Sequence, residues 1–218
     1  MTVRLARAVI CSATFAVGMI APCSAEAVTV GHASSGSLFQ CGNGGSFFVQ
    51  TSLAPVSPSY TIPPGGGIID RWSTGTMGAT PGAQITLLVL QPTSSTTYRV
   101  VAFDTQQLPN PPPSGNIATF AIAPALSVPA GSVLGLLGGP TGMVGCLGLG
   151  GAQDGVSFGT ASPPMVDASY TQTTTAANRL LNVEVNLVQS TDVGVVSSAT
   201  PATINAGGVG FLRFSISN

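Results

Sequence analysis

The chain has 218 residues, of which 44% are hydrophobic and 6% are charged, and its formal net charge is −1. It contains no lysine, and this balance excludes both the basic surface that nucleic-acid binding requires and a long acidic tail. Because disorder needs low hydrophobicity together with high charge, the composition instead predicts a packed core.

Residues 1–27 have the order of a secretory signal peptide. Two arginines start the segment, an apolar run follows over residues 8–21, and Ala25 and Ala27 give the A-x-A pattern of a cleavage site. Cleavage is expected after Ala27, or else after Ala25. The apolar run is short for a bilayer span. We therefore expect a secreted or cell-surface protein with no membrane span once the signal is removed.

Removal of the signal leaves two cysteines, Cys41 and Cys146. In an exported chain, a lone pair of cysteines is most simply a disulfide. Closing a loop of this length would stabilise the fold by roughly 4 to 5 kcal/mol. Two buried thiols are the alternative. Since these cysteines and the distant His32 do not make a tetrahedral site, no metal and no cofactor are expected.

Strands are predicted where apolar residues recur at every second position. The predicted strands cover residues 47–52, 67–72, 84–91, 97–104, 117–123 and 180–189, with an apolar strand pair bent at residues 129–131. In the last of these strands, apolar side chains alternate with Asn182, Glu184 and Asn186. These three polar side chains are expected to face water.

Turn-forming residues at 63–67, 91–96 and 108–116 separate the predicted strands, and no helical pattern lies between them. Even spacing of this kind predicts an all-β fold, specifically an antiparallel β-sandwich of the jelly-roll type over residues 28–189. Residues 161–178 are expected to be a polar connection. Residues 133–151 are uncharged, but their eight glycines and Pro140 favour buried strands over a membrane helix.

Residues 155–159 read G-V-S-F-G and match the nucleophile elbow of serine hydrolases, with Ser157 at its centre. That motif needs a following helix and a later histidine, whereas the single histidine, His32, lies upstream. A catalytic role for Ser157 is therefore not expected.

Six acidic residues follow the signal peptide, and none has the spacing of a paired acid and base. They are expected to be solvated, although carboxylates distant in sequence can meet in space in glycosidases. The six are Asp70, Asp104, Asp154, Asp167, Glu184 and Asp192.

Trp72 and Tyr60 are the aromatic candidates for ligand binding. Trp72 is the only tryptophan, and Tyr60 lies just before the same predicted strand. Aromatic rings on an exposed face can stack on sugars. Because aromatic residues are scarce in this chain, a core position is favoured for Trp72.

The C-terminal residues 190–218 resemble the start of an immunoglobulin-like conserved-repeat module of bacterial surface proteins. Asp192, Val193 and Val195 match its opening strand; Pro201, Ile204, Gly207 and Gly208 match its turn; Leu212, Phe214, Ile216 and Asn218 match its second strand. Gly210 and Arg213 depart from the usual valine and threonine. The resemblance implies an incomplete repeat, and hence the N-terminal part of a longer protein.

The longer part of the chain, residues 47–151, looks like the uncharacterised secreted β-sandwich domains of actinobacteria. The stretches IPPGGGIIDRW, ITLLVLQPTSSTTYRVVAFD and VPAGSVLGL carry this likeness. It implies a fold and an extracellular location, but no ligand.

Three functions are compatible with these features. The leading hypothesis is a non-enzymatic secreted or cell-surface structural or adhesion module, with no catalytic residue. The second is a glycan-binding jelly-roll domain, and the third is a secreted hydrolase. The expected partners are a cell-surface polymer, a glycan or another protein, and not nucleic acid.

Overall fold

The computed structural model describes residues 27–36, 39–41, 45–140, 144–189, 194–200 and 211–217. For residues 40, 41, 194–200 and 211–217, only the backbone is described. These parts of the chain contain strands and connections but no helix, and all strand pairs in them are antiparallel. The all-β antiparallel prediction is therefore confirmed. The predicted signal peptide lies outside the described residues except for Ala27, where the first strand begins.

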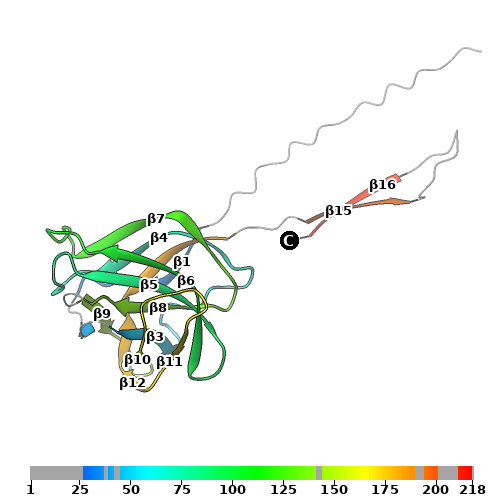
Figure 1. The fold of residues 1–218 in the computed structure, drawn as a ribbon. Helices are drawn as coiled ribbons and strands as arrows, with labels where there is room; N and C mark the ends of the chain where they lie inside the picture. Colours follow the sequence, from blue (N-terminus) through cyan, green and yellow to red (C-terminus); the bar gives the residue numbers. More distant parts are fainter. Residues whose placement is uncertain are drawn as a thin grey trace, which may run out of the picture.

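One sheet has four strands in the order β1-β14-β4-β7. Figure 1 shows β7, β4 and β1 along one side of the molecule. The register pairs Trp72 with Val185 on one side and with Phe120 on the other. The strands are β1 (Ala27–His32), β14 (Val183–Val188), β4 (Gly67–Gly75) and β7 (Ile117–Val128).

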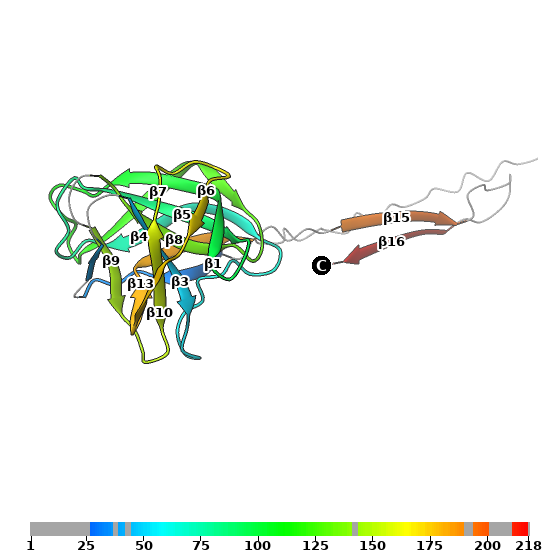
Figure 2. The ribbon, with the colours of Figure 1, turned by 60° about the horizontal axis from the view of Figure 1, so that its bottom comes forward.

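The second sheet has seven strands and curls into a half-barrel, with the order β11-β6-β5-β8-β3-β10-β12 (Figures 1 and 2). Its central strands follow the runs of apolar and β-branched residues predicted from the sequence. The strands are β11 (Ser169–Thr171), β6 (Thr97–Gln107), β5 (Gln84–Pro92), β8 (Val133–Gly138), β3 (Ser46–Ser52), β10 (Gly155–Thr160) and β12 (Thr174–Ala177).

Two smaller sheets complete the described strands. A three-stranded sheet has the order β13-β9-β2, with β13 (Arg179–Leu181), β9 (Val144–Leu149) and β2 (Phe39–Cys41). Strands β15 (Gly194–Thr200) and β16 (Phe211–Ser217) pair with each other as a hairpin. The immunoglobulin-like identity predicted for this hairpin stays a prediction.

The main apolar core lies between the four-stranded and seven-stranded sheets. In β14 the alternation is regular: Val183, Val185 and Leu187 are buried, whereas Glu184 and Asn186 are partly exposed. These valines and leucines pack in one cluster with residues of β5, β8 and β3. Each fully buried side chain of this size contributes about 1.5 to 3 kcal/mol relative to an exposed one. Packing of the two sheets against each other therefore stabilises the fold substantially.

Strand β5 is buried on both faces. Its residues 85–90 form a continuous buried run. Leu87 and Val89 join the core between the sheets, whereas Leu88 and Leu90 join a second cluster on the opposite face of the seven-stranded sheet. Tyr170 is part of this second cluster. An uninterrupted apolar run is what a strand covered on both sides requires.

The expected polar connection at residues 161–178 is only partly a connection. It contains β11 and β12, which form the two edges of the seven-stranded sheet. Both strands are short and rich in threonine, and β12 is largely exposed. Polar side chains on edge strands hinder pairing with other chains. Because β11 and β12 therefore carry few apolar residues, a search for apolar alternation does not find them.

Asn182 is buried, with 1% of its surface exposed, so the prediction that it faces water is wrong. The chain passes from β13 in one sheet to β14 in another at this residue. Asn182 Oδ1 accepts the Ser34 N–H at 2.8 Å, and its Nδ2 donates to the Gly145 carbonyl at 2.7 Å. The Asn182 side chain therefore satisfies backbone groups where its own segment meets the segment after β1 and strand β9.

Residues 133–151 form two strands, β8 and β9, as expected. They lie in different sheets and do not pair with each other. Among the described residues, no helix is long and apolar enough to cross a membrane.

Candidate binding pocket

Several hollows open on the described surface. One, of about 720 Å³, is an apolar groove between β1 and residues 59–64. Another of about 470 Å³ adjoins Gly45 and Pro140, next to segments outside the described residues. A third, of about 290 Å³, combines polar and apolar side chains and is lined throughout by described residues. This third pocket offers both hydrogen-bonding and apolar groups to a ligand.

This Tyr98–Gln172 pocket lies at one end of the seven-stranded sheet. It is built where β3 ends, where β8 begins, and where β5 turns into β6, and the segment after β11 closes one side. With Tyr60 and Thr61, five segments distant in sequence therefore contribute to it. Its lining residues are Gln50, Thr51, Ser52, Leu53, Tyr60, Thr61, Pro92, Ser95, Tyr98, Val133 and Gln172.

Gln172 is held in place by two hydrogen bonds to the turn between β5 and β6. Its backbone N–H donates to the Thr96 carbonyl at 2.9 Å, and its Nε2 donates to the Ser95 carbonyl at 3.1 Å. The turn itself is fixed by Ser94, whose Oγ accepts the Thr97 N–H at 3.0 Å. The amide of Gln172 is therefore fixed in position.

Tyr98 brings an aromatic ring and a hydroxyl to the same pocket. Its ring belongs to the second apolar cluster and lies edge-on to Phe47, with ring centroids 6.4 Å apart. Its hydroxyl donates to Gln172 Oε1 at 3.2 Å. Burial raises the pKa of Tyr98, so the phenol stays protonated at neutral pH.

Gln50 and Tyr60 line the pocket but use their polar atoms within the fold. Gln50 Oε1 accepts the Leu181 N–H at 2.7 Å, and its Nε2 faces three backbone carbonyls, including that of Gly155 at 3.2 Å. The Tyr60 hydroxyl donates to the Leu181 carbonyl. Burial, with smaller contributions from Asp154 and Glu184, strongly raises the pKa of Tyr60. Tyr60 therefore anchors β13.

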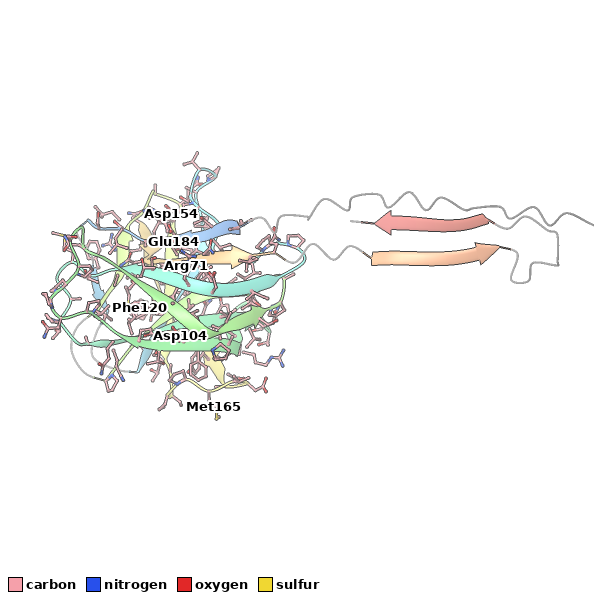
Figure 3. All side chains as sticks on the ribbon, turned by 90° about the horizontal axis from the view of Figure 1, so that it is seen from above. Arg71, Asp104, Phe120, Asp154, Met165 and Glu184 are labelled. Carbon is pink, nitrogen blue, oxygen red and sulfur yellow. The ribbon has the colours of Figure 1, made fainter. Side chains whose placement is uncertain are left out.

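Trp72 is completely buried and lies in the core between the two larger sheets. Its indole packs against Phe120 with ring centroids 4.8 Å apart, and its Nε1 donates to Asp104 Oδ2 at 2.7 Å. Figure 3 labels Asp104 and Phe120, which come from β6 and β7. Neither face of Trp72 is open to a ligand.

Ser157 lies within strand β10 rather than on a turn before a helix. Its side chain is buried, and its Oγ is 3.0 Å from the Thr51 hydroxyl and 2.8 Å from the Thr175 hydroxyl. The three hydroxyls link β3, β10 and β12. The local geometry of a nucleophile elbow is therefore not present at residues 155–159.

Asp154 is buried, with 2% of its surface exposed, contrary to the expectation of a solvated carboxylate. It accepts the Ala54 N–H at 2.7 Å, the Gly151 N–H at 2.6 Å and the Ser57 hydroxyl at 3.0 Å. Burial opposes ionisation, but these hydrogen bonds outweigh it and lower the pKa of Asp154. The carboxylate thus ties the loop after β3 to the turn before β10.

The other described carboxylates are more exposed than Asp154. Asp70 accepts a hydrogen bond from Asn186 at 3.0 Å and lies 3.5 Å from Arg71 at the surface. Asp167 pairs with Arg99 at 3.4 Å, also at the surface. Asp192 lies outside the described residues.

The backbone brings the two cysteines of the predicted disulfide into one sheet. Cys41 pairs with Val144 in the register of β2 with β9, two residues from the buried Cys146. The side chain of Cys41 lies outside the described residues, so the disulfide stays a prediction.

Among the described residues, no group of three or more histidine, cysteine or acidic side chains could hold a metal ion.

Comparison with protein-family models, curated proteins and solved structures found no match to this chain.

Proposed function

We propose that this chain is a non-enzymatic structural or adhesion module that is exported to the cell surface or medium. We further propose that its two larger sheets form a jelly-roll-like sandwich of the kind found in secreted bacterial domains. The β15–β16 hairpin would then belong to an immunoglobulin-like module.

One observation carries the proposal: the side chains best suited to chemistry are used to hold the fold together. Asp154 ties two loops, Asn182 joins two sheets and the Ser157 hydroxyl bridges neighbouring strands. Buried polar groups that are fully hydrogen-bonded make a fold rigid and specific. Rigidity without many charges suits a domain that presents a surface outside the cell.

Export can be tested on the full chain produced in a bacterial host. The expected result is a processed protein in the medium or on the cell surface, with an N-terminus at Val28 or Glu26. Deleting residues 8–21 should retain the chain in the cytoplasm. An unprocessed cytoplasmic protein would contradict the proposed location.

Adhesion can be tested by coating beads with the exported protein and measuring their retention on bacterial cell walls and on purified surface polymers. Retention above that of beads coated with heat-unfolded protein supports the adhesive role. Turnover of ester or glycoside substrates that Ser157→Ala abolishes would favour the hydrolase alternative.

Glycan binding is the second candidate function, and the Tyr98–Gln172 pocket favours it. The pocket offers hydroxyl and amide groups beside aromatic and aliphatic side chains. This combination suits a ligand that has both polar and apolar faces.

A further inference from the structure

We propose that the Tyr98–Gln172 pocket binds a neutral sugar unit of a polysaccharide. This inference rests on the proposed adhesive function, because it names the chemistry through which the domain would hold a surface polymer.

The pocket has hydrogen-bonding capacity that the fold leaves unused. In the described part of the chain, the side-chain hydroxyls of Ser52 and Ser95 have no hydrogen-bond partner. Gln172 Nε2 makes one hydrogen bond and carries a second N–H, and the Tyr98 oxygen donates its hydrogen but keeps its acceptor sites. A ligand in this pocket therefore meets both donors and acceptors.

The balance of donors and acceptors matches a polyol. Each sugar hydroxyl donates one hydrogen bond and accepts others, as the serine hydroxyls lining the pocket also do. An anion would need several donors and no lone pairs pointing at it. The exposed hydroxyls and the amide of Gln172 offer no such set.

The lining carries no charged side chain. Its only ionisable groups are the phenols of Tyr60 and Tyr98, and burial raises the pKa of both. Acidic and basic ligands would thus lose their hydration without gaining an ion pair. A neutral ligand loses much less hydration free energy on entering the pocket than a charged one does. The pocket therefore selects against charged polymers.

Apolar groups complete the match. Pro92, Val133 and Leu53 line the pocket beside the tyrosines. A pyranose ring presents C–H groups on its faces and hydroxyls at its edge, so it can contact both kinds of wall at once. A volume of about 290 Å³ has room for a sugar ring together with some water.

The polar groups are also fixed before a ligand arrives. Gln172 is held by its backbone bond to Thr96 and its side-chain bond to Ser95, and the Tyr98 ring is packed in the second apolar cluster. Binding therefore pays little of the ordering cost that weakens flexible sites.

The decisive variant is Tyr98→Phe, which removes one hydroxyl from the pocket and keeps the ring in its cluster. Its matched control is Tyr170→Phe, since Tyr170 is buried in the same cluster and its hydroxyl donates to the Ser162 carbonyl, outside the pocket. A second pair is Gln172→Ala with Gln189→Ala as control. Gln189 also donates one exposed 3.1 Å hydrogen bond to a backbone carbonyl, that of Pro64.

Binding is measured by titration calorimetry of the purified full chain against defined probes. The neutral probes are soluble amylose, cellohexaose, yeast mannan and arabinan. Polygalacturonate serves as the acidic probe and decaproline as the peptide probe. At least one neutral probe should bind, and Tyr98→Phe and Gln172→Ala should each weaken it at least about fivefold. The two control variants should bind as the wild type does.

Three results would overturn the inference. They are no binding to any neutral probe, unchanged binding by Tyr98→Phe and Gln172→Ala, and tighter binding to polygalacturonate or decaproline than to every sugar. Circular dichroism and melting temperature show whether each variant is folded. The bead-retention assay separates this inference from the proposed function, because retention that survives Tyr98→Phe keeps the adhesive role and removes only this pocket from it.

Discussion

The indole N–H of Trp72 donates a hydrogen bond to the carboxylate of Asp104 at 2.7 Å, from the four-stranded sheet to the seven-stranded sheet. The indole ring lies in the shared apolar core, and its one polar atom is satisfied by a partly exposed carboxylate. The pair therefore joins the two sheets through packing and a charge-assisted hydrogen bond together.

Asp104→Ala should destabilise the chain by about 1 to 3 kcal/mol. The variant leaves the buried Trp72 N–H without its partner, and this is the usual cost of an unsatisfied buried donor. Urea unfolding measures the effect. Asp167→Ala is the control, because its carboxylate makes only a surface pair with Arg99 and should leave stability nearly unchanged. Equal stabilities for the two variants would show that the Trp72–Asp104 bond contributes nothing.

Asp154→Asn should destabilise the chain by about 2 to 3 kcal/mol at neutral pH. The carboxylate accepts three hydrogen bonds, and an amide would place an N–H group against the N–H of either Ala54 or Gly151. Thermal and urea unfolding at pH 7 check this prediction. A loss below about 0.5 kcal/mol would contradict the structural role of the three hydrogen bonds to Asp154.

The same carboxylate predicts how stability depends on pH. The pKa of Asp154 is lowered in the folded protein, whereas the pKa of an aspartate in the unfolded chain is about 3.9. The stabilisation is therefore complete above the unfolded pKa and is lost as pH falls through the lowered native pKa. As the pH falls below about 5, the wild type should therefore lose stability more steeply than Asp154→Asn. Parallel curves for the two proteins would contradict this assignment.

The strands that were predicted correctly have a local cause. Residues 84–91 carry a continuous apolar run and residues 180–189 an alternating one, and both runs lie in strands, although the structure divides the second run at Asn182 between β13 and β14. The polar edge strands β11 and β12 lack such a pattern, because solvent covers one side of them. Asn182 was assigned to the wrong face because its burial depends on a passage between sheets that no local pattern encodes.

The binding pocket could not be predicted for a similar reason. Ser52, Ser95, Val133 and Gln172 lie far apart in sequence and meet only because β3, β8, β5 and β6 are adjacent in the sheet. Alternation fixes which face a residue occupies but not which strand lies beside it. The sequence made Trp72 and Tyr60 candidates because aromatic residues are rare in this chain. In the structure, the unused hydrogen-bonding groups belong instead to Ser52, Ser95 and Gln172.

Ser157→Ala should lower stability by about 1 kcal/mol through loss of the hydroxyl chain with Thr51 and Thr175. Ser73→Ala is a matched control, because Ser73 makes a single exposed hydroxyl contact with Thr119 at 2.9 Å. The control should cost less, since water replaces an exposed partner readily. Urea unfolding of both variants tests the difference, and a larger effect at Ser73 would contradict the structural role of Ser157.

The predicted disulfide between Cys41 and Cys146 is tested by cysteine alkylation and by the free energy of unfolding of cysteine variants. Alkylation of the processed, unfolded protein should modify no cysteine before reduction, and both Cys41 and Cys146 after it. The double variant Cys41→Ser, Cys146→Ser should then lose roughly 4 to 5 kcal/mol, because a covalent link across so long a loop restricts the unfolded chain strongly. The two single variants should each lose as much as the double variant, since either one breaks the same bond. Alkylation of both cysteines without reduction would show that they are thiols, and the double variant should then lose far less through burial of polar serine side chains alone.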